Sequence, residues 1–107
     1  MSYKRKLNRH IFSRFFDDAD YQSVNRVCKR YEGLMKDAGM TKMNVQYSSI
    51  QRLDAMCEVP SGVAGHVKDE IETELEHSMP GAVEVGEARI TDIGNGMSRV
   101  QVPILPR

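Results

Sequence analysis

The stretch DYQSVNRVCKRYEGLMKDA, residues 20–38, is the most strongly patterned part of the chain. Its apolar residues recur every three or four positions, so at 100° per residue they share one face of a helix. Aspartates ahead of the first turn are candidate caps, and Gly39 is placed to end the helix. The stretch therefore predicts an amphipathic helix whose buried stripe consists of Tyr21, Val24, Val27, Cys28, Tyr31, Leu34, Met35 and Ala38.

Beyond this helix, residues 42–59 alternate between apolar and polar side chains around Ser48 and Ser49. Alternation with a period of two is typical of strands that bury one face, so two strands are predicted here. A helix through Ile50, Leu53 and Met56 is the competing interpretation. The inward residues of the two strands would be Met43, Val45, Tyr47, Leu53, Ala55, Cys57 and Val59.

A second helix is predicted to start at Pro60-Ser61-Gly62 and to run to about Met79, where Pro80-Gly81 ends it. Ser61 is the expected N-cap residue. One face of this helix is strongly acidic, which indicates a surface that faces water. The other face carries a single apolar stripe of Val63, Val67, Ile71, Leu75 and Met79.

The end of the chain alternates again, and Gly94-Asn95-Gly96 supplies residues that tolerate positive φ, so a hairpin is predicted there. The start of the chain fits two structures. Leu7, Ile11 and Phe15 fit a helix, whereas a strand would bury one side of residues 9–15. The alternating apolar residues of the end are Val83, Val85, Ala88, Ile90, Val100, Val102 and Ile104.

Together these elements predict an α+β fold for residues 1–107, taken as one domain. Two amphipathic helices would pack on one face of a mainly antiparallel sheet. If the start is a strand, the order becomes βαββαβ, which is the ferredoxin-like arrangement, plus one extra C-terminal strand. This arrangement hosts many unrelated functions, so the fold alone selects none.

Composition places the chain among ordinary globular proteins, with 40% hydrophobic and 28% charged residues in a length of 107. Charge is segregated: residues 1–36 hold nine Lys and Arg against four Asp and Glu, and the remainder holds six against eleven. The two cysteines, Cys28 and Cys57, fit no metal-ligand spacing and indicate a reducing, cytoplasmic location. No apolar run is long enough to cross a membrane, so membrane partners are not expected.

The basic and aromatic start of the chain suggests nucleic-acid binding, because cations neutralise phosphates and exposed rings stack on bases. The opposing interpretation places Phe12, Phe15 and Phe16 in the core, with the cations as a solvated rim. The residues that would bind nucleic acid are Tyr3, Lys4, Arg5, Lys6, Arg9, Phe12 and Arg14, extended on the first helix by Arg26, Lys29 and Arg30.

Catalytic, metal and cofactor sites are not predicted, and the chain carries no enzyme signature. His66 and His77 are eleven residues apart on one helix, too far to share an ion, and a surface contact between His66 and Glu70 is expected instead. The two cysteines fall on inward positions, which favours a structural role. An anion site at the turn of residues 60–66 is disfavoured by the acidic helix that follows.

The favoured prediction is a small non-enzymatic module that binds another protein or itself, as a homodimer, a regulator or an inhibitor. An edge strand of an open sheet can pair with another chain, and segregated charge suits a complementary contact. Asp69, Glu72 and Glu76 would form the acidic side of that contact. Nucleic-acid binding ranks second because a pI of about 6.8 is low for a dedicated nucleic-acid binder.

Overall fold

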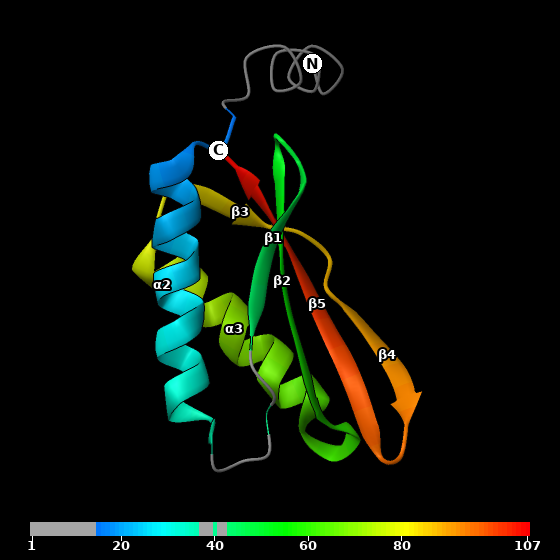
Figure 1. Ribbon diagram of the computed structural model, residues 1–107. Helices are drawn as coiled ribbons and strands as arrows, with labels where there is room; N and C mark the ends of the chain where they lie inside the picture. Colours follow the sequence, from blue (N-terminus) through cyan, green and yellow to red (C-terminus); the bar gives the residue numbers. More distant parts are fainter. Residues whose placement is uncertain (1–14, 37–39, 41–42) are drawn as a thin grey trace, which may run out of the picture.

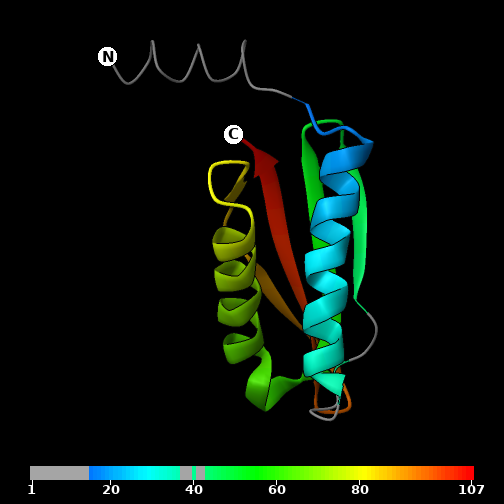
Figure 2. The same ribbon diagram turned by 90° about the vertical axis from the view of Figure 1, so that its left-hand side faces the viewer.

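The computed structural model describes residues 15–36, 40 and 43–107. Two helices lie side by side and pack against one face of a sheet (Figures 1 and 2). The predicted α+β class is therefore confirmed. In chain order the elements are α2 Asp18–Leu34, β1 Asn44–Ser49, β2 Arg52–Pro60, a 3-10 turn Ser61–Val63, α3 Ala64–Ser78, β3 Val83–Val85, β4 Arg89–Gly94 and β5 Met97–Pro106.

The sheet is antiparallel in every described pair, with the strand order β1-β2-β5-β3. The long β5 pairs with β2 on one side. Its other side pairs with β3 along residues 104–106 and with β4 along residues 97–101. Three strands thus depend on β5, whose residues Val100, Val102 and Ile104 are fully buried.

The position of β5 distinguishes this sheet from that of the βαββαβ arrangement. In the βαββαβ arrangement, a strand ahead of the first helix would occupy the place between β2 and β3. The C-terminal strand β5 occupies that place here. The alternative predictions of a strand or a helix concern residues 1–16, of which residues 1–14 lie outside the described residues. Phe15 and Phe16 are described and belong to neither a helix nor a strand.

Helix α2 begins at a capping box, in which the Asp17 carboxylate accepts from the Asp20 N–H at 2.9 Å and the Asp20 carboxylate accepts from the Asp17 N–H at 3.1 Å. The helix ends at Leu34, earlier than the predicted Ala38. The reason lies in the last turn: the Met35 N–H is shared between the carbonyls of Tyr31 and Glu32, which tightens the backbone. Leu34, predicted to be buried, is 72% exposed.

Helix α3 carries its predicted apolar stripe, with Ala64, Val67, Ile71 and Leu75 buried. The prediction that Ser61 caps this helix was wrong. Ser61 lies in the preceding 3-10 turn, where its hydroxyl is 2.7 Å from the Ser98 hydroxyl and its N–H donates to the Gly96 carbonyl at 2.8 Å. Ser61 therefore links the start of α3 to the hairpin of β4 and β5 by hydrogen bonds.

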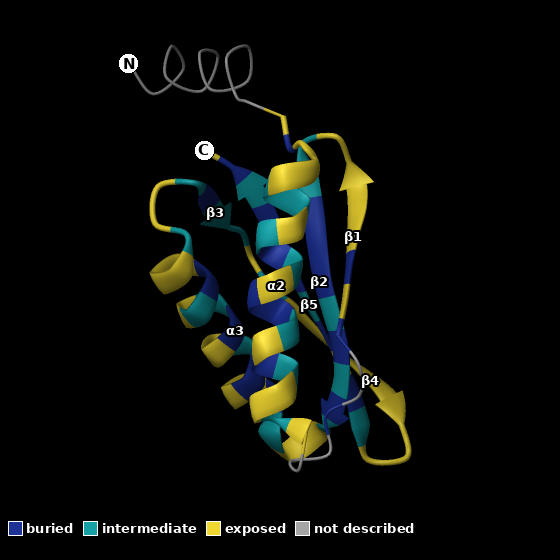
Figure 3. Cartoon of the chain, turned by 60° about the vertical axis from the view of Figure 1, so that its left-hand side comes forward, coloured by how far each residue is buried: buried dark blue, intermediate teal, exposed yellow. Residues whose placement is uncertain are grey.

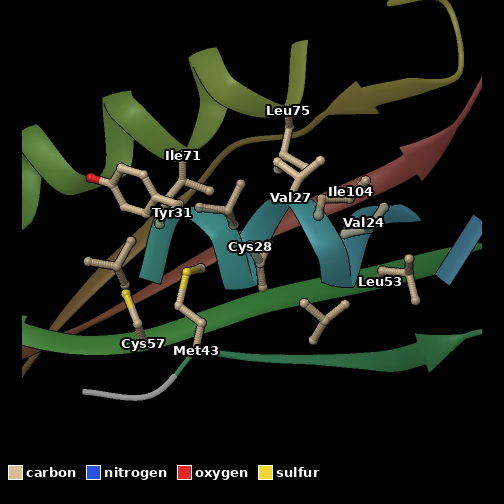
Figure 4. Packing of buried hydrophobic residues seen from close by; sticks show 14 of the residues in the cluster. Val24, Val27, Cys28, Tyr31, Met43, Leu53, Cys57, Ile71, Leu75 and Ile104 are labelled. Atoms are coloured by element: carbon tan, nitrogen blue, oxygen red, sulfur yellow. The ribbon is translucent and has the colours of Figure 1, made fainter. Parts of the chain in front are cut away.

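The core fills the space between the helices and the covered face of the sheet (Figure 4). Its largest fully buried side chains include Met43, Leu53, Ile71, Leu75 and Ile104. Two of the chain's phenylalanines are described, and they divide between core and solvent: Phe16 is buried and Phe15 is exposed. Among the described residues, no helix combines the length and the apolar character needed to span a membrane.

Candidate interaction edge

Strand β4 forms part of one edge of the sheet. It pairs with β5 on one side, and no other described strand pairs with it. All six of its residues are exposed, as Figure 3 shows along the strand. An edge strand of this kind presents a row of N–H and C=O groups that no neighbouring strand satisfies. The outer side of β4 is therefore one place where another extended backbone can pair.

The end of this edge is defined by the hairpin turn. Gly94, Asn95 and Gly96 have φ values of 86°, 57° and 74°, which confirms the predicted use of residues that tolerate positive φ. A register shift interrupts the pairing of β4 with β5 between Asp92 and Gly94. The Asp92 carboxylate accepts a hydrogen bond from the Gly94 N–H at 2.9 Å. Regular strand geometry thus runs from Arg89 to Asp92.

Two isoleucines give β4 apolar character. Ile90 and Ile93 are 42% and 37% exposed. Ile90 lies opposite Val100 in the ladder and so shares the face of the sheet that the helices cover. Helix α3 packs on β5 and β3 and helix α2 packs on β1, which leaves Ile90 at the margin of this cover. An added strand would extend the apolar surface around it.

Strand β1 lies at the opposite edge of the sheet. There, side chains of α2 form hydrogen bonds with the backbone at the start of the strand. Lys29 Nζ donates to the Met43 carbonyl at 2.8 Å, and the Glu32 carboxylate accepts from the Met43 N–H at 2.6 Å. The Tyr21 hydroxyl donates to the Val45 carbonyl at 2.8 Å. Alternate residues direct their backbone groups to the same side of a strand, so these bonds occupy the start of one side of β1, at Met43 just before the strand and at Val45 within it. We call this set of contacts the capped edge.

The basic residues of α2 do not form a single patch, because Lys29 lies apart from Arg26 and Arg30. Lys29 belongs to the capped edge and also pairs with Glu32 at 3.3 Å. Arg30 pairs with Glu74 of α3 at 2.8 Å. Arg26 is exposed and has no hydrogen-bonding or ionic partner among the described residues. The structure brings Arg26 and Arg30 together around one hollow and places Lys29 against β1. The other predicted nucleic-acid-binding residues lie outside the described residues: Tyr3, Lys4, Arg5, Lys6, Arg9, Phe12 and Arg14.

The acidic side of α3 is partly neutralised by a lysine on the same helix. Lys68 Nζ is 3.0 Å from the Asp69 carboxylate and 3.3 Å from the Glu72 carboxylate. Hydrogen bonds to Asp69 and then Glu72 raise the pKa of Lys68. Glu76 is exposed further along the helix. Asp69, Glu72 and Glu76 were predicted to form one acidic contact. In the structure Lys68 bridges Asp69 and Glu72, and Glu76 lies outside this cluster.

The predicted contact of His66 with Glu70 and the predicted inward positions of the two cysteines are confirmed. His66 Nε2 is 3.6 Å from the Glu70 carboxylate, and both side chains are exposed. Within the described residues, no group of three or more His, Cys, Asp and Glu side chains could hold a metal ion. Cys28 and Cys57 are buried free thiols. Burial, with smaller charge effects, raises the pKa of Cys28 to about 12 and that of Cys57 to about 11, so both thiols stay protonated near neutral pH.

In comparisons with known proteins, no protein-family model, no curated protein and no solved structure matches the chain. The two edges therefore have to be interpreted from their own chemistry. Sequence reasoning anticipated an open edge strand without identifying β4 as that strand. The capped edge was not predicted. In the sequence, Lys29 and Glu32 look like ordinary surface residues, and their contacts depend on the position of β1 beside α2.

Proposed function

We propose that this chain is a protein-interaction module that binds an extended segment of another protein along the outer edge of β4. The observation that carries this proposal is the contrast between β4, whose outer side is open, and the start of β1, where side chains of α2 bond to the backbone of Met43 and Val45. Strand addition uses backbone hydrogen bonds for affinity and side-chain contacts for specificity.

A short segment of a different protein fits this edge better than a second copy of the chain. The regular part of β4 is short, since a strand of six residues is about 20 Å long. A stable dimer needs an interface of roughly 1,200 Å² or more, which a pair of short edge strands does not supply. A flexible peptide can instead follow the twist of β4 along its whole length. Self-association is accordingly an outcome that the experiment must exclude.

The side chains of β4 specify the chemistry of that segment. Ile90 faces the helix-covered side of the sheet, and its neighbour Arg89 faces the other side. Arg89 has no ionic partner among the described residues. The fitting partner is therefore an extended peptide with an apolar residue beside Ile90 and an acidic residue beside Arg89.

The proposal is tested by selecting peptides from a random decapeptide library on the full chain and measuring their binding to matched variants. Ile90→Lys places a charge on the edge, which is a substitution that natural edge strands use against pairing. The control is Ile50→Lys, because Ile50 is 66% exposed and lies between β1 and β2. We expect the selected peptides to lose at least about tenfold in affinity for Ile90→Lys, the equivalent of one or two lost contacts.

Ile50→Lys should bind those peptides as the unchanged chain does. Peptides that bind Ile90→Lys with unchanged affinity, or a library that yields no peptide at all, would contradict the proposal. Sedimentation of the chain alone addresses self-pairing: a dimer that Ile90→Lys dissociates would show that β4 binds a second copy and not a foreign segment.

A further inference from the structure

A hollow of about 490 Å³ lies between α2 and the segment that follows the C-terminal end of α3. This volume falls in the range of small-molecule sites. The hollow involves no residue of β4, so an inference about it does not rest on the proposed function. Its lining divides into a cationic, hydroxyl-bearing rim and an apolar wall.

The rim is formed mainly by one face of α2. Ser23, Arg26 and Arg30 follow one another at spacings of three and four residues, and Ser78 faces them from the end of α3. Arg30 is held in place, because its guanidinium donates to the Glu74 carboxylate at 2.8 Å and to the Ser78 hydroxyl at 2.9 Å. A guanidinium has five N–H donors, so Arg30 keeps donors for a ligand.

Charge in this rim is unbalanced by a single unit. Glu74 offsets Arg30, whereas Arg26 has no described partner. Two like charges four residues apart destabilise a helix slightly, and a bound anion would remove that cost. The backbone carbonyls at the end of α3 carry partial negative charge, which opposes a doubly charged ligand. The rim therefore suits a monoanion.

The wall of the hollow is apolar. Val27 is buried, and Met79 and Ala82 are partly buried against the core. A bare inorganic ion would leave this surface in contact with water. A ligand with a short hydrocarbon body would cover it and gain hydrophobic stabilisation in proportion to the area removed from water.

We propose that this hollow binds a small amphipathic carboxylate. The carboxylate accepts hydrogen bonds from Arg26, with Arg30 and Ser23 beside it, and the apolar body rests on Val27, Met79 and Ala82. A guanidinium and a carboxylate form short, charge-assisted hydrogen bonds that are about twice as strong as neutral ones. Free acids and the carboxyl terminus of a peptide share this chemistry.

Octanoate is the probe, titrated into the full chain and followed by amide chemical shifts. We expect saturable shifts confined to residues 23–30 and 78–82, with a Kd on the order of 1 mM for a ligand of ten heavy atoms in an open site. Arg26→Gln should weaken octanoate binding about tenfold, because it removes the unpaired cation. Lys36→Gln is the matched control, since Lys36 is exposed, follows the same helix and does not line the hollow.

Two further probes separate the head group from the tail. Octanol lacks the charge, and inorganic phosphate lacks the apolar body, so each should bind at least about tenfold more weakly than octanoate. A peptide that ends in leucine with a free carboxylate is compared with the same peptide ending in an amide. This comparison tests whether the hollow binds the carboxyl terminus of a peptide. The proposal is overturned if octanol matches octanoate, if phosphate binds more tightly, if Arg26→Gln leaves the affinity unchanged, or if no shift saturates.

Discussion

The two edges of this sheet differ in what satisfies their backbone. Along β1, three side chains of α2 bond to the backbone of Met43 and Val45. Along β4, the Asp92 contact with the Gly94 N–H is the one side-chain bond to the strand's own backbone within the described residues. A protein that leaves an edge open risks pairing with unwanted strands. The chain reduces that risk at the start of β1 and retains it along β4, which is consistent with the proposed binding edge.

The comparison also shows how the same helix serves two purposes. The apolar face of α2 packs into the core, while Tyr21, Lys29 and Glu32 at its margin reach the backbone of β1 and the residue before it. Helix α3 contributes no equivalent bond to β4 within the described residues. The difference follows from position, since α3 packs on β5 and β3.

The largest effect is expected from Glu32→Ala, which breaks the capped edge. Glu32 accepts from the Met43 N–H and pairs with Lys29, so its removal takes the acceptor from a partly buried N–H and one of two partners from Lys29. Hydrogen bonds to charged groups contribute about 1.5–3 kcal/mol. We expect the free energy of unfolding in urea to fall by about 2 kcal/mol.

Glu76→Ala is the control for this change, because Glu76 is an exposed glutamate on α3. Its removal should alter the free energy of unfolding by less than about 0.5 kcal/mol. Equal losses in the two variants would show that Glu32 does not cap the edge.

A smaller loss is expected from Tyr21→Phe, which removes the hydroxyl that donates to the Val45 carbonyl. The ring should keep its stacking on Tyr47, whose centroid is 5.4 Å away. One neutral hydrogen bond contributes about 1 kcal/mol, and thermal or urea unfolding measures this loss. Tyr31→Phe is the matched control, and it should not lower the stability. The Tyr31 hydroxyl is buried and has no hydrogen-bond partner among the described residues.

Removal of that unpaired hydroxyl should leave the protein as stable as before or slightly more stable, since a buried polar group without a partner is costly. Burial raises the pKa of Tyr31 to about 12, with additional contributions from Glu70, Cys57 and Glu74. If Tyr31→Phe costs more than Tyr21→Phe, the assignment of the capping bond is wrong.

The smallest effect on stability is expected at the open edge. Ile90→Lys places a charge at a side chain that is already 42% exposed, so the free energy of unfolding should change by less than about 0.5 kcal/mol. Urea unfolding of this variant is therefore the companion measurement to peptide binding. A loss of more than about 2 kcal/mol would mean that Ile90 belongs to the core and not to a binding edge.

Patterning in the sequence was sufficient to predict most of the secondary structure. The stripe around Val24 and the alternation around Ala55 each report a local period, and each appears as a helix or a strand in the structure. The ends of elements were less predictable: the early end of α2 depends on the backbone bonds of Met35. Ser61 was misassigned because its partner, Ser98, is 37 residues away.

The candidate site was less accessible to sequence reasoning because it depends on the order of strands in space. Nothing in residues 89–94 indicates that β5 would take the central place and leave β4 at an edge. Arg26 and Arg30 were noted as cations, but the hollow between them and Ser78 exists only once α3 is packed beside α2. Local periodicity identifies faces of elements, whereas sites require the arrangement of those faces.

The most direct test of the open edge is amide hydrogen exchange on the full chain, with and without a peptide selected for binding. Strand addition predicts that alternate residues of β4 between Arg89 and Gly94 become protected when the peptide binds, while the amides of β1 keep the exchange rates of the free protein. Protection that appears along β1, or a bound peptide that leaves every amide of β4 unchanged, would contradict the account.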